Sequence, residues 1–103
     1  MAYEVEWAAS AVEGLLEAIE YIGRDSPSYA ASLAISADRA AVSLSELPNR
    51  GQRVPEFKDP DVRELAVGKY RLIYRVRPGQ VSILAFVHSA RDLAALLRYD
   101  QRT

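Results

Sequence analysis

Three arginines lie at nearby positions of one predicted strand, and the only histidine of the chain closes the next strand. The arginines are Arg71, Arg75 and Arg77, and the histidine is His88. Cleavage of RNA by its own 2′-hydroxyl needs a base, an acid and a cation that stabilises the charge developing on the phosphate. Histidine can act as acid or base near neutral pH. An RNA-cleaving site is therefore one hypothesis for this segment.

Other residues would have to complete such a site. Glu56 or Glu64 would act as the base, and Arg91 would be a second cation beside Arg71. The structural alternatives stay open, because a single histidine at a strand end is more often a hydrogen-bonded structural residue. Arginines on an exposed strand are commonly a solvated face. With no second histidine, no cysteine and no His-Glu-x-x-His motif, we expect neither a metal nor a cofactor.

The pairing of the two strands decides which of these side chains share a face. If the strands pair symmetrically about Pro78-Gly79, Leu72 faces Ala85 and Tyr74 faces Ile83 on an apolar face. A one-residue bulge would break this register. The symmetric register predicts an open face with a cationic rim around an aromatic anchor. Such a face suits the binding of a partner protein. That face would carry Arg71, Arg75, Ser82, Phe86 and His88.

The first half of the chain is expected to form a strand and a helical hairpin. Residues 3–7 alternate apolar and acidic side chains, which predicts a half-buried strand. Apolar residues at helical spacing follow Ser10, which we expect to form a capping box with Glu13. A second, alanine-rich helix should start at Ser26 as N-cap and end at Pro48. Two such helices can pack closely as an antiparallel pair.

The second half is expected to supply most of the sheet. It should contain a loop at 49–61, two strands within 62–76, a strand at 80–88 and a short helix at 91–98. The order β-α-α-β-β-β(-α) predicts an α+β fold in which the helical hairpin packs on a small antiparallel sheet. The last strand would lie beside the first. The predicted core consists of Leu15, Leu16, Ile19, Leu33, Leu44, Leu72, Tyr74 and Ile83.

Length and composition indicate one globular domain, residues 1–103. Half of the residues are hydrophobic, which is enough for a core, and there is no cysteine for disulfides or thiolate metal sites. No apolar run approaches the roughly 18 residues of a membrane helix, and the N-terminus lacks the basic region of a signal peptide. We expect a cytoplasmic protein without membrane association.

The charges are unevenly distributed although the net charge is only −1. Residues 1–48 hold two basic and eight acidic residues, whereas residues 49–103 hold eleven basic and six acidic ones. One interpretation is a local cationic surface that attracts an anionic partner. The alternative is that the N-terminal helices simply have acidic outer faces.

Four segments resemble the ParE branch of the RelE/ParE toxin superfamily. They read AIEYIGRDSPSYA, LPNRGQRVPEF, RELAVGKYRLIYRV and ILAFVHSARDL, and the resemblance extends over residues 3–97. It implies the fold predicted above and a toxin of a type II toxin–antitoxin pair. It also implies a cognate antitoxin, a small DNA-binding protein with a disordered tail, and no specific DNA binding by the toxin itself.

The resemblance leaves two activities to choose between. RelE-type relatives are ribosome-dependent mRNA endonucleases, whereas ParE-type relatives poison DNA gyrase. Arg71 matches a nuclease arginine on the scissile phosphate and Glu56 lies in the loop of a base, but Ala90 stands where a catalytic side chain is expected. Dense phosphate contact needs many cations, and the net charge is −1. We therefore favour gyrase inhibition without catalysis; an endonuclease, or an inactive relative that only binds antitoxin, is the alternative.

The sequence thus gives two sets of candidate site residues. The candidates for a nuclease are Glu56, Arg71, His88 and Arg91. The candidates for contacts with the antitoxin or target are Arg63, Arg71, Arg75, Phe86, His88 and Arg91.

Overall fold

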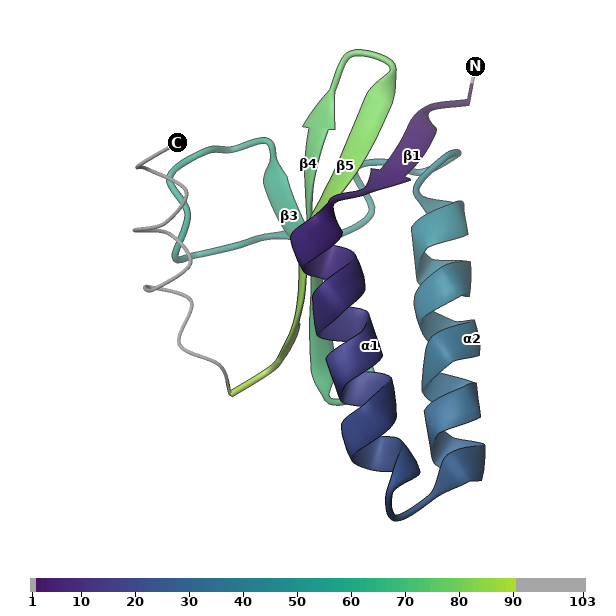
Figure 1. The fold of residues 1–103 in the computed structure, drawn as a ribbon. Helices are drawn as coiled ribbons and strands as arrows, with labels where there is room; N and C mark the ends of the chain where they lie inside the picture. Colours follow the sequence, from purple (N-terminus) through teal and green to yellow (C-terminus); the bar gives the residue numbers. More distant parts are fainter. Residues whose placement is uncertain (1, 91–103) are drawn as a thin grey trace.

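Two helices cover one face of a five-stranded sheet in the computed structural model, which describes residues 2–90 (Figure 1). The α+β class and the helical hairpin on the sheet are confirmed. The helix predicted at 91–98 lies outside the described residues. The elements are β1 (Glu4–Trp7), α1 (Ala9–Gly23), α2 (Pro27–Ser43), β2 (Gln52–Arg53), β3 (Val62–Val67), β4 (Tyr70–Arg77) and β5 (Gln80–His88).

The strand order is β1-β5-β4-β3-β2, so the last strand lies beside the first as predicted. β5, β4, β3 and β2 pair antiparallel in turn, but β1 runs parallel to β5. The sheet is therefore mixed, where the sequence was expected to give an antiparallel one. The short strand β2 falls inside the predicted loop at 49–61. There the hydroxyl of Tyr74 accepts a hydrogen bond of 2.9 Å from the backbone N–H of Gly51.

The two helices begin in different ways. The side chain of Ser26 accepts a hydrogen bond from the backbone N–H of Tyr29 at 3.2 Å, so the predicted cap of α2 is confirmed. The predicted capping box of α1 is wrong, because the helix begins at Ala9 and Ser10 lies in its first turn. The hydroxyl of Ser10 donates instead to the carbonyl oxygen of Leu84 in β5, at 2.8 Å. This bond ties the start of α1 to the sheet.

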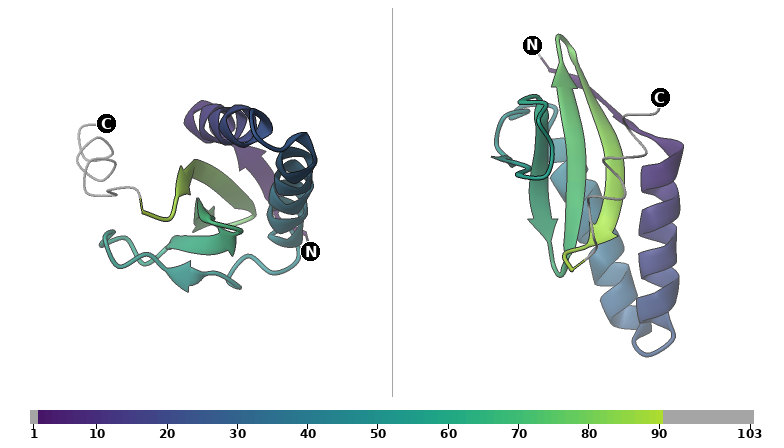
Figure 2. Two further views of the ribbon diagram at one scale, coloured as in Figure 1. Left: turned by 90° about the horizontal axis from the view of Figure 1, so that it is seen from below. Right: turned by 90° about the vertical axis from the view of Figure 1, so that its left-hand side faces the viewer.

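The main core lies between the helices and the sheet (Figure 2). Five of the predicted core residues are buried there, namely Leu33, Leu44, Leu72, Tyr74 and Ile83. Leu15 and Ile19 are only partly buried. The prediction for Leu16 is wrong, since 59% of this residue is exposed. Ala11 and Ala18 are the buried residues of α1, so the helix approaches the core through small side chains.

A second, smaller core covers part of the other face of the sheet. Val54 and Phe57 pack with Val62 and Ile73, against the partly buried Ala85 and Val87. Residues 54–61 therefore lie over a face that the sequence was expected to leave open. The loop brings its acidic side chains close to β4.

Helix α1 also approaches the edge of β5 closely. β1 pairs with Gln80–Ile83, and α1 comes alongside β5 beyond that point. A Cβ atom added to Gly14 would lie 2.3 Å from the carbonyl oxygen of Phe86. Covering a strand edge with a helix protects its backbone groups from pairing with other chains, and only glycine allows this distance.

Candidate functional site

The β4–β5 hairpin contains a bulge that changes which side chains share a face. Tyr74 faces Ile83 and Arg75 faces Ser82 as predicted, but the register shifts between Ile73 and Tyr74. Beyond the shift Arg71 pairs with Val87 and Leu72 pairs with Phe86. Because of the extra residue, the side chains in the C-terminal part of β5 point to the face opposite to the one predicted.

The prediction that Phe86 and His88 share a face with Arg71 is therefore wrong. Phe86 is 2% exposed and belongs to the core on the helix side. Its ring stacks on that of Tyr70 at a centroid distance of 5.2 Å, and the ring of His88 meets Tyr70 edge-on at 5.4 Å. Because successive strand residues point to opposite faces, Arg71 lies on the other side of the sheet. Phe86 is not the exposed anchor that the symmetric register predicted.

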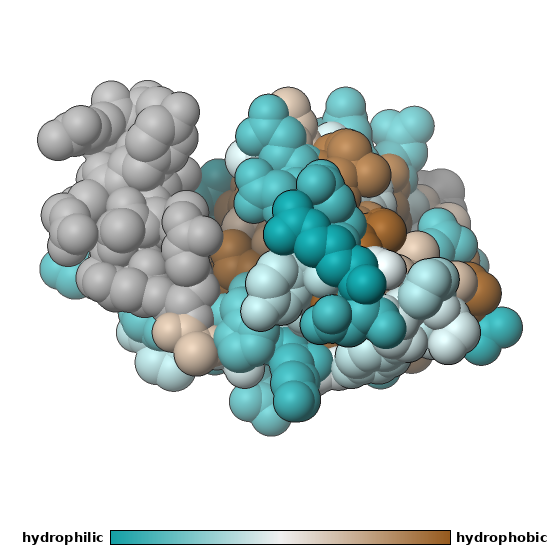
Figure 3. Space-filling view, turned by 60° about the horizontal axis from the view of Figure 1, so that its bottom comes forward, coloured by the Kyte–Doolittle hydropathy of each residue, from teal (hydrophilic) through white to brown (hydrophobic). Residues whose placement is uncertain are grey.

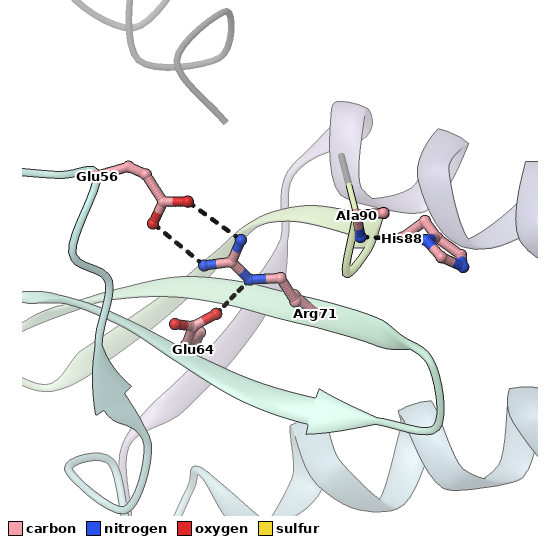
Figure 4. A network of polar contacts seen from close by, with 5 residues as sticks. All are labelled: Glu56, Glu64, Arg71, His88 and Ala90. Carbon is pink, nitrogen blue, oxygen red and sulfur yellow. Dashed lines mark hydrogen bonds and ion pairs between the residues drawn. The ribbon is translucent and has the colours of Figure 1, made fainter. Parts of the chain in front are cut away.

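Arg71 is held between two carboxylates (Figure 4). Its Nε donates to Glu64 on β3, and its two terminal nitrogens each donate to one oxygen of Glu56 at 3.3 Å. The side chain of Arg71 is only 15% exposed. Its hydrogen bonds, the one to Glu64 foremost, raise its pKa above the ordinary value. Two of the nuclease candidates, Glu56 and Arg71, are thus brought together. Their side chains form an ion pair with each other.

The same loop also binds the other arginines of β4. Arg75 Nε donates to Asp59 at 3.2 Å, and Arg77 donates to Asp61 at 2.9 Å. The sequence analysis did not single out these two aspartates. The signal was available, since the segment Lys58 to Asp61 places two carboxylates in the loop before the arginine-bearing strand. Arg71, Arg75 and Arg77 thus each bind carboxylates of their own chain.

His88 points away from this network (Figure 4). Its Nδ1 accepts a hydrogen bond of 3.1 Å from the backbone N–H of Ala90, which closes the turn after β5. Arg63 lies across from Tyr74 in the register and donates to the carbonyl oxygen of Gly51 at 2.8 Å. Arg91 lies outside the described residues. The predicted site residues thus divide between the two faces of the sheet.

A comparison with protein families assigns the chain. Residues 5–93 match the family described as the ParE toxin of a type II toxin–antitoxin system, parDE. The chain belongs to the ParE toxin family. The resemblance inferred from the sequence is confirmed.

Relatives of this ParE-family chain carry both names of the superfamily. This chain is 36% identical over 89 residues to Toxin RelE2 of Caulobacter vibrioides. The aligned region covers 85% of this chain and 97% of that protein. Two solved structures share the fold. One is described as the chromosomal ParDE system from P. aeruginosa, with a TM-score of 0.70, 19% identity and coverage of 84% of this chain and 96% of that one. The other is the RelBE2 toxin–antitoxin complex from Mycobacterium tuberculosis, with a TM-score of 0.59, 24% identity, and coverage of 88% and 95%.

This ParE-family chain also has an open cleft of about 870 Å³ beside the C-terminal half of β5. One wall is a stripe along α1 that includes Ser10, Gly14, Glu17 and Tyr21, and His88 stands at the far end. The sequence indicated only that the N-terminal helices could have acidic outer faces, and it did not predict that the glutamates of α1 line a cleft. Among residues 2–90 there is no group of three or more His, Cys, Asp or Glu side chains that could hold a metal ion.

Within residues 2–90, neither α1 nor α2 combines the length and the apolar character that crossing a membrane requires.

We expect the loop at 54–61 to loosen in acid. The hydrogen bond from Arg71 lowers the pKa of Glu56 from its ordinary value of 4.5, and the backbone N–H of Asp61 lowers the pKa of Asp59 from 3.8. A carboxylate whose pKa is lower in the folded state stabilises the fold above its unfolded pKa, and this contribution disappears as the pH falls through the folded pKa. Urea unfolding between about pH 6 and pH 3 should therefore show falling stability.

The Glu56→Gln variant tests the cause of this pH dependence. It should lose stability at pH 6 and show a shallower decline toward pH 3 than the wild type. The matched control is Glu4→Gln on the exposed side of β1, which should keep the wild-type slope. Equal slopes for all three proteins would contradict the assignment of the pH dependence to the contact between Glu56 and Arg71.

Proposed function

We propose that this chain is the toxin of a type II toxin–antitoxin pair and that it inhibits DNA gyrase by binding it. Membership of the ParE family supports the toxin assignment, and gyrase is the target that the resemblance to ParE implies. A gyrase-binding toxin acts in the cytoplasm. The observation that carries the proposal is the separation of the candidate catalytic groups across the sheet.

Acid–base cleavage of RNA needs an acid and a base that both reach the scissile phosphate. His88 packs on Tyr70 at the helix side of the sheet, whereas Glu56 binds Arg71 on the opposite face. The contact with Arg71 lowers the pKa of Glu56, which weakens that carboxylate as a base. The same contact occupies the cation that would stabilise the transition state. The geometry of these residues therefore suits binding better than catalysis.

A pair of assays with the purified chain tests the target. We expect it to inhibit supercoiling of relaxed plasmid by gyrase and to leave ribosome-bound mRNA intact. Cleavage of the mRNA without an effect on gyrase would replace this proposal with the endonuclease. Inactivity in both assays would identify an inactive relative that only binds antitoxin.

The ribosome-dependent mRNA endonuclease is the second candidate. It is favoured by the direct contact of Arg71 with Glu56 and Glu64, because a substrate phosphate could replace a carboxylate as the partner of the guanidinium. The 36% identity to a protein named Toxin RelE2 points the same way. In that case the candidates would remain Glu56, Arg71, His88 and Arg91.

His88→Ala is expected to leave growth inhibition largely unchanged. The side chain of His88 makes contacts with Tyr70 and with the backbone of its own turn, which a gyrase-binding mechanism does not require. Induced expression in a gyrase-sensitive host, with protein levels matched by immunoblot, measures this. A folded His88→Ala protein that has lost its toxicity would favour the endonuclease.

We further propose that the antitoxin covers the outer side of the helical hairpin. The open sheet face predicted from the sequence does not have the expected aromatic anchor and cationic rim. Phe86 is buried, and Arg71 binds carboxylates of its own chain. The hairpin instead exposes large apolar side chains at helical spacing, which an amphipathic partner helix can bury. They are Val12 and Leu16 on α1, and Ile35 and Val42 on α2, each 40–61% exposed.

Introducing charge into this surface should weaken the complex. The double variant Leu16→Lys and Ile35→Lys is expected to lower antitoxin affinity at least about tenfold, since exposed apolar anchors carry much of the binding energy. Leu47→Lys is the matched control, because Leu47 is 61% exposed but follows the end of α2. Titration calorimetry with the purified antitoxin measures both. Equal affinities for wild type and double variant would place the antitoxin elsewhere.

A further inference from the structure

Three arginines near the edge strand β2 form no ion pair within the part of the chain that the structure describes. They are Arg50, Arg53 and Arg63, which we call the arginine patch; the first two are exposed and the third is partly buried. The arginines of β4, by contrast, all bind carboxylates of the loop at 54–61. Glu46 lines a small pocket with Arg50, but these two side chains are not paired. The arginine patch is therefore a cationic surface that the described residues do not neutralise.

Two members of the arginine patch are held in place around Gly51. Arg63 donates to the carbonyl oxygen of Gly51 at 2.8 Å, and Arg50 donates to the hydroxyl of Ser43, the last residue of α2, at 2.6 Å. Burial raises the pKa of Tyr74, whereas the hydrogen bond with Gly51 and the nearby charges of Arg63 and Arg50 act in the opposite direction. A guanidinium group has five N–H donors. Each of these two arginines therefore keeps donors for a ligand.

The third member, Arg53, lies directly opposite Arg63 in the register of β2 and β3. Like charges in directly opposed positions of neighbouring strands destabilise a sheet. Among residues 2–90, no hydrogen bond or ion pair of the Arg53 side chain offsets this repulsion. An anion bound between the two guanidinium groups would remove it. A local choice that costs stability without a gain inside the fold is typical of a functional site.

The surroundings of the arginine patch indicate the chemical class of the anion. Asn49 and Gln52 are exposed beside the arginines, and Leu47 is the one large apolar side chain that is exposed in the segment 46–53. Protein interfaces have an apolar core, whereas interfaces with DNA are more polar and more positively charged. Phosphates follow one another at about 3.4 Å of helix axis along a DNA strand. Neighbouring β-strands lie about 4.8 Å apart, so two opposed arginines can reach successive phosphates.

We propose that the arginine patch binds the phosphate backbone of the duplex DNA that gyrase holds. This inference rests on gyrase as the proposed target and extends it, because the toxin would contact the enzyme and its DNA together. Phosphate contacts carry no sequence information, which agrees with the expectation of no specific DNA binding. Three contacts bind free DNA only weakly, since the affinity grows with the number of neutralised phosphates. Binding to gyrase raises the effective concentration of the DNA, and the weak contact then adds to the affinity.

Lys69 offers a matched control at the other end of the molecule. It is an exposed cation in the turn between β3 and β4, about 20 Å along the strand from Arg63. The neighbouring Gly68 lies close to Tyr29 in the first turn of α2, whereas the arginine patch contacts the last residue of α2. Figure 3 views the molecule from the end at which α1 and α2 meet, and hydrophobic surface is visible there between hydrophilic side chains. The two ends thus differ in character.

Arg53→Glu is the decisive variant, because its stability and its DNA affinity should change in opposite directions. The new carboxylate would face Arg63 as an opposite charge, so the variant should melt about 1–4 °C above the wild type. Its affinity for a short DNA duplex at low ionic strength should fall at least about fivefold, and the salt dependence should decrease by about one to two phosphate contacts. Lys69→Glu makes the same change of charge and should keep the wild-type salt dependence. Fluorescence anisotropy measures binding. An unchanged DNA affinity for Arg53→Glu would overturn the inference.

Gyrase supercoiling in the presence of the same three proteins separates this inference from the proposed target. Arg53→Glu should need at least about fivefold more protein for half-inhibition, and Lys69→Glu no more than about twofold. Equal inhibition by Arg53→Glu and the wild type would overturn the inference and leave gyrase as the target. A wild-type chain that does not inhibit gyrase would overturn both. Unchanged inhibition with a loss of antitoxin affinity would assign the arginine patch to an acidic segment of the antitoxin instead.

Discussion

Leu72→Ala is expected to lower the free energy of unfolding by about 2–5 kcal/mol, the range for large-to-small substitutions in a packed core. Leu72 is 0% exposed and belongs to the cluster between the helices and the sheet. Its neighbours in the register, Leu65 on β3 and Phe86 on β5, also pack in this cluster. The truncated side chain would leave a cavity that these strands cannot close without breaking their pairing.

Leu16→Ala provides the control for the same change of side chain. Leu16 is 59% exposed, so its replacement should change stability by no more than about 0.5 kcal/mol. Urea unfolding of both variants at neutral pH measures the difference. A small effect for Leu72→Ala, or a larger effect for Leu16→Ala, would contradict the orientation of the sheet and of α1.

Gly14→Ala is expected to destabilise the protein by about 1–3 kcal/mol, the usual cost of overpacking. The new Cβ atom would lie 2.3 Å from the carbonyl oxygen of Phe86. Both positions are fixed by the backbone of a regular element, so no side chain can rotate to relieve the contact. The helix would have to move away from β5 and release the bond between Ser10 and Leu84.

Gly23→Ala is the matched control, because Gly23 is also a glycine of α1. An added Cβ there would meet the Cβ of Ala30 at an ordinary 3.7 Å. Alanine favours helix over glycine by up to about 1 kcal/mol, so this variant should be as stable as the wild type or more so. The two substitutions should thus change the melting temperature in opposite directions. A Gly14→Ala protein as stable as the Gly23→Ala protein would show that α1 does not lie this close to β5.

Local patterns in the sequence were enough to predict the elements of the fold. Alternation placed the first strand, Ser26 and Pro27 marked the start of α2, and the glycines at 68 and 79 marked turns where φ is +59° and +77°. These signals depend on residues close together in the chain. The parallel pairing of β1 with β5 joins residues more than seventy positions apart, and local patterns do not report it.

The errors at the site have a single main cause. The bulge that leaves Leu84 between the pairs of Ile83 and Ala85 moved Phe86 and His88 to the helix side of the sheet. Nothing in the alternation of β5 indicates it, because every residue from Val81 to Val87 except Ser82 is apolar. Asp59 and Asp61, the partners of Arg75 and Arg77, were missed for a related reason. They come from a loop, and the position of a loop over a sheet depends on tertiary packing, here on Phe57.

The most direct measurement of the central claim is gyrase supercoiling in the presence of the wild-type chain and of a Glu56→Gln, His88→Ala double variant. Binding without catalysis predicts dose-dependent inhibition by both proteins, with half-inhibitory concentrations within about twofold if both remain folded. The same preparations should leave ribosome-bound mRNA uncut. Unimpaired supercoiling with the wild type, together with mRNA cleavage that the double variant loses, would contradict the account and assign the chain to the ribosome-dependent endonucleases.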